Sequence, residues 1–482
     1  MRFDFVRSAP FAIAGLLAVR LPLLAQRRFD ADELEHAHAA WCLFRGMVPY
    51  RDFFEHHTPW YYFVLRPLFS WFTVDRSFDS AVHFLCLGRW LSLALAAISI
   101  WLVVVIGRLW QDQRVGLVAA LLLVSQPIFL QKTIEVRPDG LALALFLAAL
   151  VCLLSAVREA PQAGRQSTWL FFWLFFWLFF AGGLCLGAAV MCTQKMLFVV
   201  PGALVGLGLG VRARLRVRSA LVFGLGVALP GALTWAAFAA RGAGSAFIGN
   251  NFLLNARWKH VATNQLLKLV TTSWPVLALA VVGAGLLLRE VAGQRRRQPE
   301  GVLLLSILAG LFLAIPVMPS PHRQYYLMPL PLIALFAARA LLAVGHQVRQ
   351  PARPWFFGVA LVAIAVLPAL ALFQAFRDRN DGQLARLRFV FDNTAPGDLV
   401  MDGWEGMGVF RPHAFHYFFL HEETLAMLPA PRLDAFLDAL EAGDVRPRLI
   451  AMDQNLWRLS PRFAAFVNQR YRTGDGFFYL VR

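Results

Sequence analysis

Long apolar stretches, separated by short polar or basic loops, make up most of the 482-residue chain. A helix needs roughly 20 apolar residues to cross the hydrocarbon core of a bilayer. On that rule the pattern predicts eleven membrane-spanning helices, at residues 9–27, 80–107, 115–130, 138–157, 169–190, 196–211, 219–240, 274–289, 301–318, 325–344 and 355–376.

Two longer segments break this pattern. Residues 28–79 are rich in charged and aromatic side chains, and helical spacing within them predicts helices lying at the membrane surface. In residues 377–482, turn signals and the apolar runs LVMD, LIAMD and FFYLV alternate with a helical pattern at Leu433–Leu440. The sequence therefore predicts an α-helical polytopic membrane domain at 1–376, with a first outer loop at 28–79, and a small α/β domain at 377–482.

The basic residues give the orientation of the spans. If the N-terminus is cytoplasmic, eleven spans place the two densest basic clusters, RARLRVR at 212–218 and RRR at 295–297, on the inner side. An excess of Lys and Arg marks cytoplasmic loops. This topology puts residues 28–79 and the C-terminal domain outside, in the periplasm of a bacterial inner membrane.

Composition supports a membrane protein and excludes other classes. The chain is 59% hydrophobic and 16% charged, whereas soluble domains carry about 25% charged residues. The net charge of +17 is divided among short clusters between apolar runs, which is typical of topology signals and contact with membrane lipids, not of nucleic-acid binding. The five cysteines are scattered and give neither a disulfide framework nor a metal-binding spacing.

The densest polar cluster opens the first outer loop. Asp30, Asp32, Glu33 and Glu35 fall within six residues at the start of a predicted helix that ends near Gly46. Asp30 and Glu33 have the spacing of a capping box, which accounts for both of them structurally. The capping box does not account for Asp32. One step along a helix turns a side chain by about 100°, so Asp32 points away from Glu33 and cannot serve the same role. Asp32 is thus a candidate functional carboxylate.

A second polar group follows in the same loop. Glu55, His56 and His57 lie among aromatic residues before a predicted helix near Pro59. These residue types can bind a metal, but adjacent histidines point apart on a regular backbone. Hydrogen-bonded interfacial residues are the simpler interpretation, and a divalent cation is an option that no ligand set demands.

Charged residues also flank three later spans on the predicted outer side. Glu135, Arg137 and Asp139 lie at the start of the fourth span, where Glu135 and Arg137 pair with each other or the two acids share a cavity with the first acidic cluster. Lys195 and Arg323 lie at the outer starts of spans, where the helix dipole disfavours a cation. Salt bridges to Glu135, to Asp139 or to the first outer loop would explain both cations. A bound anion explains them equally well, because helix N-termini and arginine bind phosphate.

Several motifs occur in the order of a known family. The segments are DADELEHAHAAWCLFRGMVPYRDFFEHHTPWYYF, TIEVRPDGLAL, TQKMLFVVPG and PHRQYYLMPLPLIAL, over about the first 345 residues. The chain resembles the bacterial lipid-carrier-dependent glycosyltransferases of the GT-C class, which relate to protein O-mannosyltransferases and to the transferase that adds aminoarabinose to lipid A. His56 stands where the lipid A branch has a lysine, which leaves the acceptor open.

The resemblance implies a polyprenyl-phosphate sugar donor and inverting transfer to a glycan, lipid or protein acceptor. It implies that Asp32 is the catalytic base and that Glu33 is the adjacent acid. It places Lys195, His322 and Arg323 near the carrier phosphate, with Tyr325 beside them, and Glu55, His56, His57, Glu135 and Asp139 in the substrate-binding region. The competing hypothesis is a transporter or flippase, but the chain shows no repeated half and its polar groups gather on one side.

Overall fold

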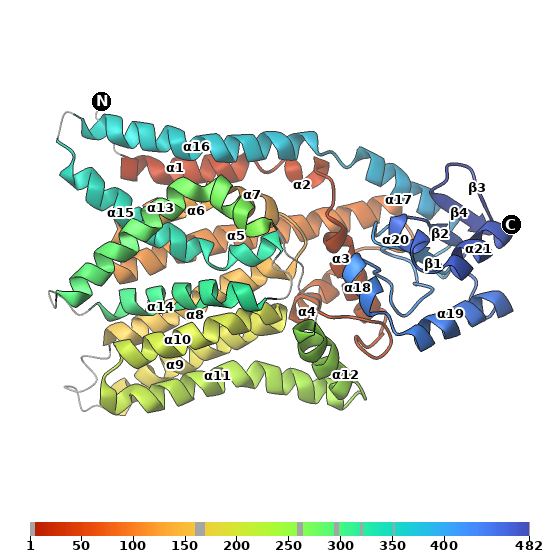
Figure 1. Cartoon of the computed structure of the whole chain (residues 1–482), viewed down its shortest axis with the longest axis horizontal. Helices are drawn as coiled ribbons and strands as arrows, with labels where there is room; N and C mark the ends of the chain where they lie inside the picture. Colours follow the sequence, from red (N-terminus) through yellow and green to blue (C-terminus); the bar gives the residue numbers. More distant parts are fainter. Residues whose placement is uncertain are drawn as a thin grey trace.

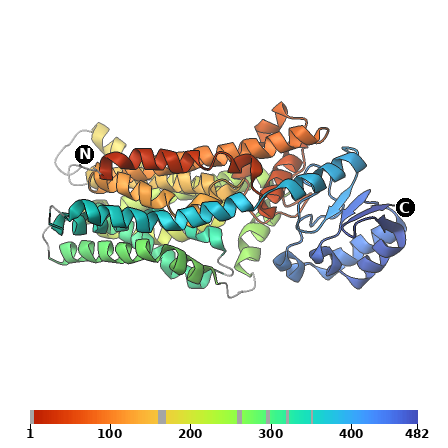
Figure 2. The ribbon, with the colours of Figure 1, turned by 90° about the horizontal axis from the view of Figure 1, so that it is seen from above.

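A computed structural model describes residues 5–159, 169–257, 264–293, 298–318, 322–349 and 352–481. Long helices run side by side along the longest axis of the molecule, and a small sheet with short helices lies beyond one end of them (Figure 1). The same arrangement is seen after a quarter turn (Figure 2).

The long and intermediate helices form the body of the molecule. In chain order they are α1 (Phe5–Ala18), α2 (Leu23–Gln26), α5 (Phe78–Trp110), α6 (Gln113–Val124), α7 (Pro127–Lys132), α8 (Pro138–Glu159), α9 (Trp169–Cys192), α10 (Val199–Gly210), α11 (Ala213–Ala239), α12 (Gly244–Ile248), α13 (Gln265–Ala292), α14 (Pro299–Ala314), α15 (Leu330–Gln347) and α16 (Arg353–Arg377). Single turns of 3-10 helix occur at Arg66–Trp71, Gln194–Phe198, Ile315–Val317 and Arg323–Leu327, and a π-helical turn at Gly249–Leu254.

Within the described ranges, nine helical segments are long and apolar enough to cross a membrane. Two shorter apolar helices, Gln113–Val124 and Gln194–Gly210, lie at the other two predicted spans. All eleven predicted spans therefore coincide with apolar helix, and the polytopic helical fold is confirmed. That the two short helices also cross the bilayer stays a prediction.

Several predicted spans differ in detail from the helices, and the first and the eighth are examples. The first is interrupted at residues 19–22, where Pro22 precedes α2 and Arg20 donates a 2.7 Å hydrogen bond to the hydroxyl of Thr133. The eighth, predicted at 274–289, is longer, because α13 begins at Gln265. The hydroxyls of Thr271 and Thr272 bond carbonyls one turn earlier in α13, which lets the polar residues join the helix.

The first outer loop contains α3 (Ala31–Phe44) and α4 (Trp60–Leu65), at the two places where surface helices were predicted. Asp30 and Glu33 form the expected capping box at the start of α3. Gly46, just after its end, has a φ of +89°, a conformation that glycine adopts without steric cost.

The C-terminal segment combines a sheet with short helices. Its helices are α17 (Asp381–Asn393), α18 (Glu422–Met427), α19 (Ala430–Ala442), α20 (Gln454–Trp457) and α21 (Pro461–Arg470). Its strands are β1 (Val400–Asp402), β2 (Leu449–Ala451), β3 (Tyr471–Thr473) and β4 (Phe478–Val481), in the order β1-β2-β4-β3. β1 and β2 are parallel, and Ile450 pairs with Met401 and with Tyr479 of the antiparallel β4.

Three of these strands coincide with the predicted apolar runs, whereas β3 was missed. Its burial falls from Tyr471 to two exposed residues, so it lacks the apolar run by which the others were found. The α/β character expected of residues 377–482 is therefore present.

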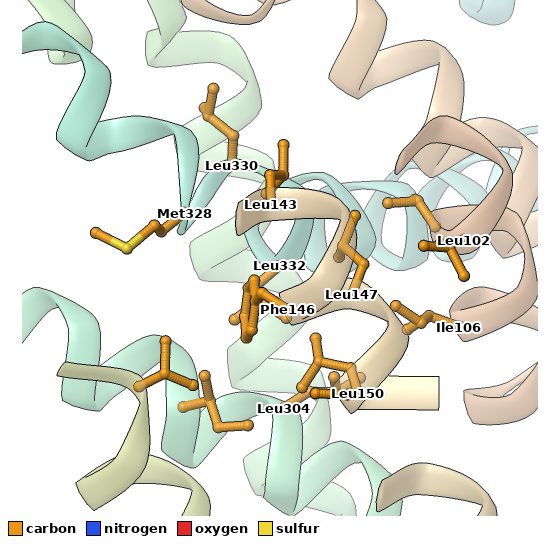
Figure 3. Close-up of a cluster of buried hydrophobic side chains, with 14 of the residues drawn as sticks. Leu102, Ile106, Leu143, Phe146, Leu147, Leu150, Leu304, Met328, Leu330 and Leu332 are labelled. Carbon is orange, nitrogen blue, oxygen red and sulfur yellow. The ribbon is translucent and has the colours of Figure 1, made fainter. Parts of the chain in front are cut away.

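Apolar side chains pack into one core inside the helices, a second that joins them to the C-terminal segment, and a third mainly within that segment, besides a small cluster around Leu23 and Leu24. Figure 3 shows part of the first, where Phe146 and Leu147 of α8 lie among Leu102 of α5 and Leu332 of α15. The second contains Leu34 and Trp41 of α3 together with Val409 and Phe410. The first outer loop and the C-terminal segment thus share one core.

Hydrogen bonds join the same two regions. The backbone N–H of Asn380 donates to the carbonyl of Gln26, and that of Arg28 donates to the carbonyl of Asp378. The side chain of Gln383 bonds both the N–H and the carbonyl of Phe29, 354 positions away. The residues just before α3 are therefore hydrogen-bonded to the C-terminal segment.

Candidate active site

The start of α3 separates the two acids expected to act together. Glu33 is fully buried, whereas the side chain of Asp32 retains 26% of its exposure. The capping box turns Glu33 back toward the N–H of Asp30, and the next position along the helix points elsewhere. Only Asp32 of this pair is accessible.

Glu33 has a complete set of partners. Its two carboxylate oxygens accept hydrogen bonds of 2.9 and 2.7 Å from the guanidinium of Arg89 on α5, which is itself fully buried. The N–H of Val136 donates to the same carboxylate at 3.0 Å. Glu33 thus fixes α3 against α5 and against the loop before α8.

Arg137 is the centre of the neighbouring network. Its Nη1 lies 2.5 Å from Oδ2 of Asp32 and 3.5 Å from Oδ1 of Asp30, and its Nε lies 3.3 Å from Oδ2 of Asp139. Burial opposes the charged form, but the surrounding carboxylates outweigh it and raise the pKa of Arg137 well above its usual value. Arg137 is therefore a permanent cation held between the first loop and α8.

The network continues to Lys195, in the turn after α9. Its ammonium forms a salt bridge to Oδ1 of Asp139 and lies 4.4 Å from the centre of the Tyr325 ring. Asp32, Arg137, Asp139, Lys195 and Tyr325 consequently form one chain of contacts across four separate segments.

A second branch surrounds Glu135. Its carboxylate lies 3.0 Å from Arg27 and 2.8 Å from Lys132, and Lys132 also lies 3.0 Å from Asp30. Burial raises the pKa of Asp30, but Lys132 and Arg137 together bring it below its ordinary value. The four carboxylates of Asp30, Asp32, Glu135 and Asp139 are therefore matched by four cations, Arg27, Lys132, Arg137 and Lys195.

Arg323 is a further cation, outside these four carboxylates and four cations. It begins the 3-10 turn before α15, and within the described ranges its side chain has no salt bridge or hydrogen bond. Burial lowers its pKa, and the nearby charge of Glu135 raises it. The salt bridge from Arg323 to Glu135 or Asp139 considered from the sequence is absent from the part of the chain that the structure describes.

His322 is the residue before Arg323. Its Nε2 lies 3.8 Å from Glu423 of α18. Burial lowers the pKa of His322, while Glu423 and Asp32 act in the opposite direction.

Glu55, His56 and His57 form a neighbouring cluster with Glu35. Oε1 of Glu55 accepts hydrogen bonds from the N–H groups of both histidines and from Nδ1 of His57 at 2.9 Å. His57 also lies 3.9 Å from Glu35. Burial, Glu55 and Asp32 raise the pKa of Glu35 well above its usual value, which favours its neutral form.

The prediction that the two adjacent histidines point apart was wrong. Their ring centroids are 4.0 Å apart, because residues 54–57 are irregular and the alternation of a strand does not apply. The ligand atoms of Glu35, Glu55, His56 and His57 all lie within 4.8 Å of one another, and Oε2 of Glu55 is buried without a hydrogen-bond partner among the described residues. These four residues could hold a divalent cation.

The structure thus gathers the predicted residues at one end of the helices. Sequence analysis missed the central position of Arg137, which it considered only as a partner of Glu135. It named Glu35 in the first acidic cluster without giving it a role, and it missed Lys132 and Arg27. The signal for Arg137 was its place between two acids in the segment TIEVRPDG.

Comparisons with solved structures define the class of fold. The chain is similar to ArnT from Cupriavidus metallidurans bound to undecaprenyl phosphate, with a TM-score of 0.67 and 13% identity over 99% of this chain and 98% of that one. It is also similar to the Archaeoglobus fulgidus oligosaccharyltransferase AglB in complex with an inhibitory peptide and a dolichol-phosphate, with a TM-score of 0.58 and 12% identity over 99% of this chain and 75% of that one.

These likenesses confirm at the level of fold the resemblance to GT-C glycosyltransferases expected from the sequence. No protein-family model and no curated protein sequence matches the chain.

Proposed function

We propose that this protein is a membrane glycosyltransferase that moves a hexosyl or pentosyl group from a polyprenyl-phosphate carrier to an acceptor hydroxyl. The observation that supports this most directly is the chain of contacts from Asp32 through Arg137 and Asp139 to Lys195. It sets an accessible carboxylate beside buried cations in a fold similar to that of a protein bound to undecaprenyl phosphate.

Asp32 is the general base of this proposal. Arg137 holds Oδ2, and no side chain of the described residues bonds Oδ1, which remains for an acceptor hydroxyl. As that oxygen attacks the anomeric carbon from the side opposite the phosphate, its proton passes to Asp32 and the sugar inverts. Proton transfer of this kind contributes about 10²–10⁴-fold to a rate.

The leaving group is a phosphate monoester, on which negative charge grows as the glycosidic bond breaks. In this proposal Lys195 and Arg323 stabilise it as cations and His322 donates a hydrogen bond to it, because preorganised charges and donors act most strongly where charge develops away from bulk water. Tyr325 lies against Lys195 and offers a hydroxyl. Burial raises the pKa of Tyr325 to about 12, so it donates a hydrogen bond and does not ionise.

Other predicted residues take supporting roles. Glu33 holds α3 through Arg89 and does not contact substrate, while Glu135 and Asp139 orient the cations. Glu55, His56 and His57 line the neighbouring substrate region, where a divalent cation would add positive charge if one binds there. The acceptor approaches from the periplasmic side, the N-terminus is cytoplasmic, and the domains divide near residue 376.

Envelope glycans and lipid-linked sugars provide the test. Cells producing the wild-type chain, Asp32→Asn or the control Asp79→Asn are compared by mass spectrometry with cells lacking the gene. Asp79 is an exposed acid on α5, with 76% of its side chain accessible. We expect a glycosylated acceptor and free carrier phosphate with the wild type and the control, and neither with Asp32→Asn.

Two results contradict the proposal. One is wild-type transfer by Asp32→Asn protein that is correctly inserted. The other is movement of a lipid-linked sugar across sealed vesicles without any covalent product, which would indicate the transporter hypothesis instead.

A further inference from the structure

A third cluster of polar side chains lies apart from the network around Arg137 and from the cluster of Glu35, Glu55, His56 and His57. His38 and Cys42 are one turn apart on α3, and His413 comes from the segment after β1. Nε2 of His38 lies 2.8 Å from Nδ1 of His413 and 3.4 Å from Sγ of Cys42, and the sulfur lies 3.9 Å from Nδ1 of His413. Two imidazole nitrogens and one thiol sulfur, which are atom types that ligate zinc, therefore face one point.

The protonation of His38 is fixed by the backbone. Its Nδ1 lies 2.9 Å from the carbonyl oxygen of Val409, and a carbonyl oxygen only accepts. Nδ1 must therefore carry the proton, and Nε2 presents its lone pair toward the other two residues. A histidine that ligates a metal almost always has this second hydrogen bond.

The distances are close to those of a tetrahedral site. With Zn–N of about 2.0–2.1 Å and Zn–S of about 2.3 Å, two nitrogens would be about 3.4 Å apart and nitrogen and sulfur about 3.6 Å apart. The two sulfur–nitrogen distances bracket the second value. Only the two imidazoles must separate, by about half an ångström.

Burial and space also suit a metal ion. His38 and Cys42 are buried, and a cavity of about 30 Å³ is lined by His38 and His413 together with Glu35 and Asp402. That is room for a water molecule, which would complete four-coordination.

We propose that His38, Cys42 and His413 bind one zinc ion that fixes the C-terminal segment to α3. On binding, the Cys42 thiol releases its proton to solvent, and the proton on Nδ1 of His413 is replaced by one on Nε2. The metal thus exchanges an existing hydrogen bond for three ligand bonds. This site shares no residue with the cluster of Glu35, Glu55, His56 and His57, and it does not depend on the proposed function.

A thiolate ligand makes the test specific. The full-length protein is purified in detergent, stripped of metal, and titrated with zinc or with cobalt, whose thiolate complexes have a charge-transfer absorption. Cys42→Ser and His413→Ala are compared with the controls Cys152→Ser, in α8, and His83→Ala, an exposed residue of α5.

For the wild type and both controls we expect at least one equivalent of bound zinc, a cobalt–thiolate band, and a Tm that rises when zinc is added. Cys42→Ser should lose the band, and His413→Ala should bind zinc at least tenfold more weakly. All variants are first checked for a single peak in size-exclusion chromatography. If a variant does not fold, protection of Cys42 from alkylation by zinc in the wild type gives the same answer.

Four results would overturn the proposal: no thiolate band in the wild type, zinc binding unchanged by Cys42→Ser, alkylation of Cys42 unaffected by zinc, or copper retained in place of zinc. The three residues would then be a hydrogen-bonded group within the aromatic core beside Phe418.

Discussion

Nη1 of Arg137 lies 2.5 Å from Oδ2 of Asp32, which joins the loop before α8 to the first turn of α3. The same guanidinium contacts Asp139, the partner of Lys195. One side chain therefore sets the positions of the proposed base and of a proposed phosphate ligand.

Replacing Arg137 by lysine tests this connection. The charge is kept, but an ammonium is a point charge and cannot reproduce the planar fork of a guanidinium. We expect Arg137→Lys to lower kcat for sugar transfer by about 10²-fold, since small misplacements of reacting groups have effects of that size. Single-turnover transfer by the purified protein measures this. Full kcat in Arg137→Lys would exclude a positioning role.

Arg323→Gln should weaken binding of the lipid phosphate. A hydrogen bond to a charged group contributes about 1.5–3 kcal/mol, so the apparent Kd for undecaprenyl phosphate should rise by about tenfold or more. Thermal-shift titration at low and high salt measures it. Arg379→Gln, which alters an exposed pair with Asp381, serves as the control, and equal affinities in the two variants would contradict the assignment.

The Glu33–Arg89 pair should determine stability more than chemistry. Removing one partner of a buried ion pair leaves an uncompensated charge and costs about 3–5 kcal/mol. Glu33→Gln and Arg89→Met should each lower the Tm strongly. The double variant should be less destabilised than the sum of the two, as a double-mutant cycle of detergent-solubilised protein would reveal. Additive losses would mean that the pair is not coupled.

Glu35 gives a pH dependence. Burial beside Glu55 and Asp32 raises its pKa well above its usual value, so the folded protein binds a proton that the unfolded chain releases above about pH 4.3. The free energy of unfolding therefore falls as pH rises from that value toward the raised pKa. Glu35→Gln should raise the Tm at pH 7.5, and its advantage should shrink toward pH 4.5.

Thermal unfolding of both proteins with a chelator present, at several pH values, measures this difference. A chelator is included because a cation among Glu35, Glu55, His56 and His57 would favour the ionised form. A difference in Tm that is the same at every pH would contradict the assignment.

Helix packing offers a prediction independent of the site. A methyl group added at Gly283 of α13 would lie 1.9 Å from the carbonyl oxygen of Phe336 on α15, whereas at Gly285 nothing lies within 4 Å. Gly283→Ala should therefore force the two helices apart and destabilise by about 1–3 kcal/mol. Gly285→Ala should be neutral or slightly stabilising, since alanine favours helix. Equal Tm values would show that α13 and α15 are not this close.

The apolar pattern was enough to locate the helices, because spanning a bilayer imposes a length and a composition that few other structures share. The capping box at Asp30 and the start of α8 at Pro138 were also predictable, since both depend on neighbours within four residues. The ends of α13 and the break after α1 were not. They depend on hydroxyl groups bonding within α13 and on Arg20 reaching Thr133.

Most residues of the site could be predicted from the sequence, but the salt bridges between them could not. Lys195 was identified by an unusual charge at the start of a span, Asp32 because the capping box did not account for it, and Asp139 as an acid at the outer start of the fourth span. Which cation meets which carboxylate depends on how α3, α8 and α9 are placed around Arg137, and no local pattern contains that. The same reason hid His413, which lies 371 positions from Cys42.

The hydrogen bonds from Asn380 and Gln383 to residues 26 and 29 have a consequence for biogenesis. The ribosome completes α3 long before it reaches Asn380 and Gln383. The residues just before α3 therefore lack these hydrogen bonds while the intervening spans are being inserted. On the proposed topology the C-terminal segment must cross the membrane before these hydrogen bonds can form. Catalytic competence would then be acquired only after export of the C-terminal segment, and a chain stalled before that point would be inserted but inactive.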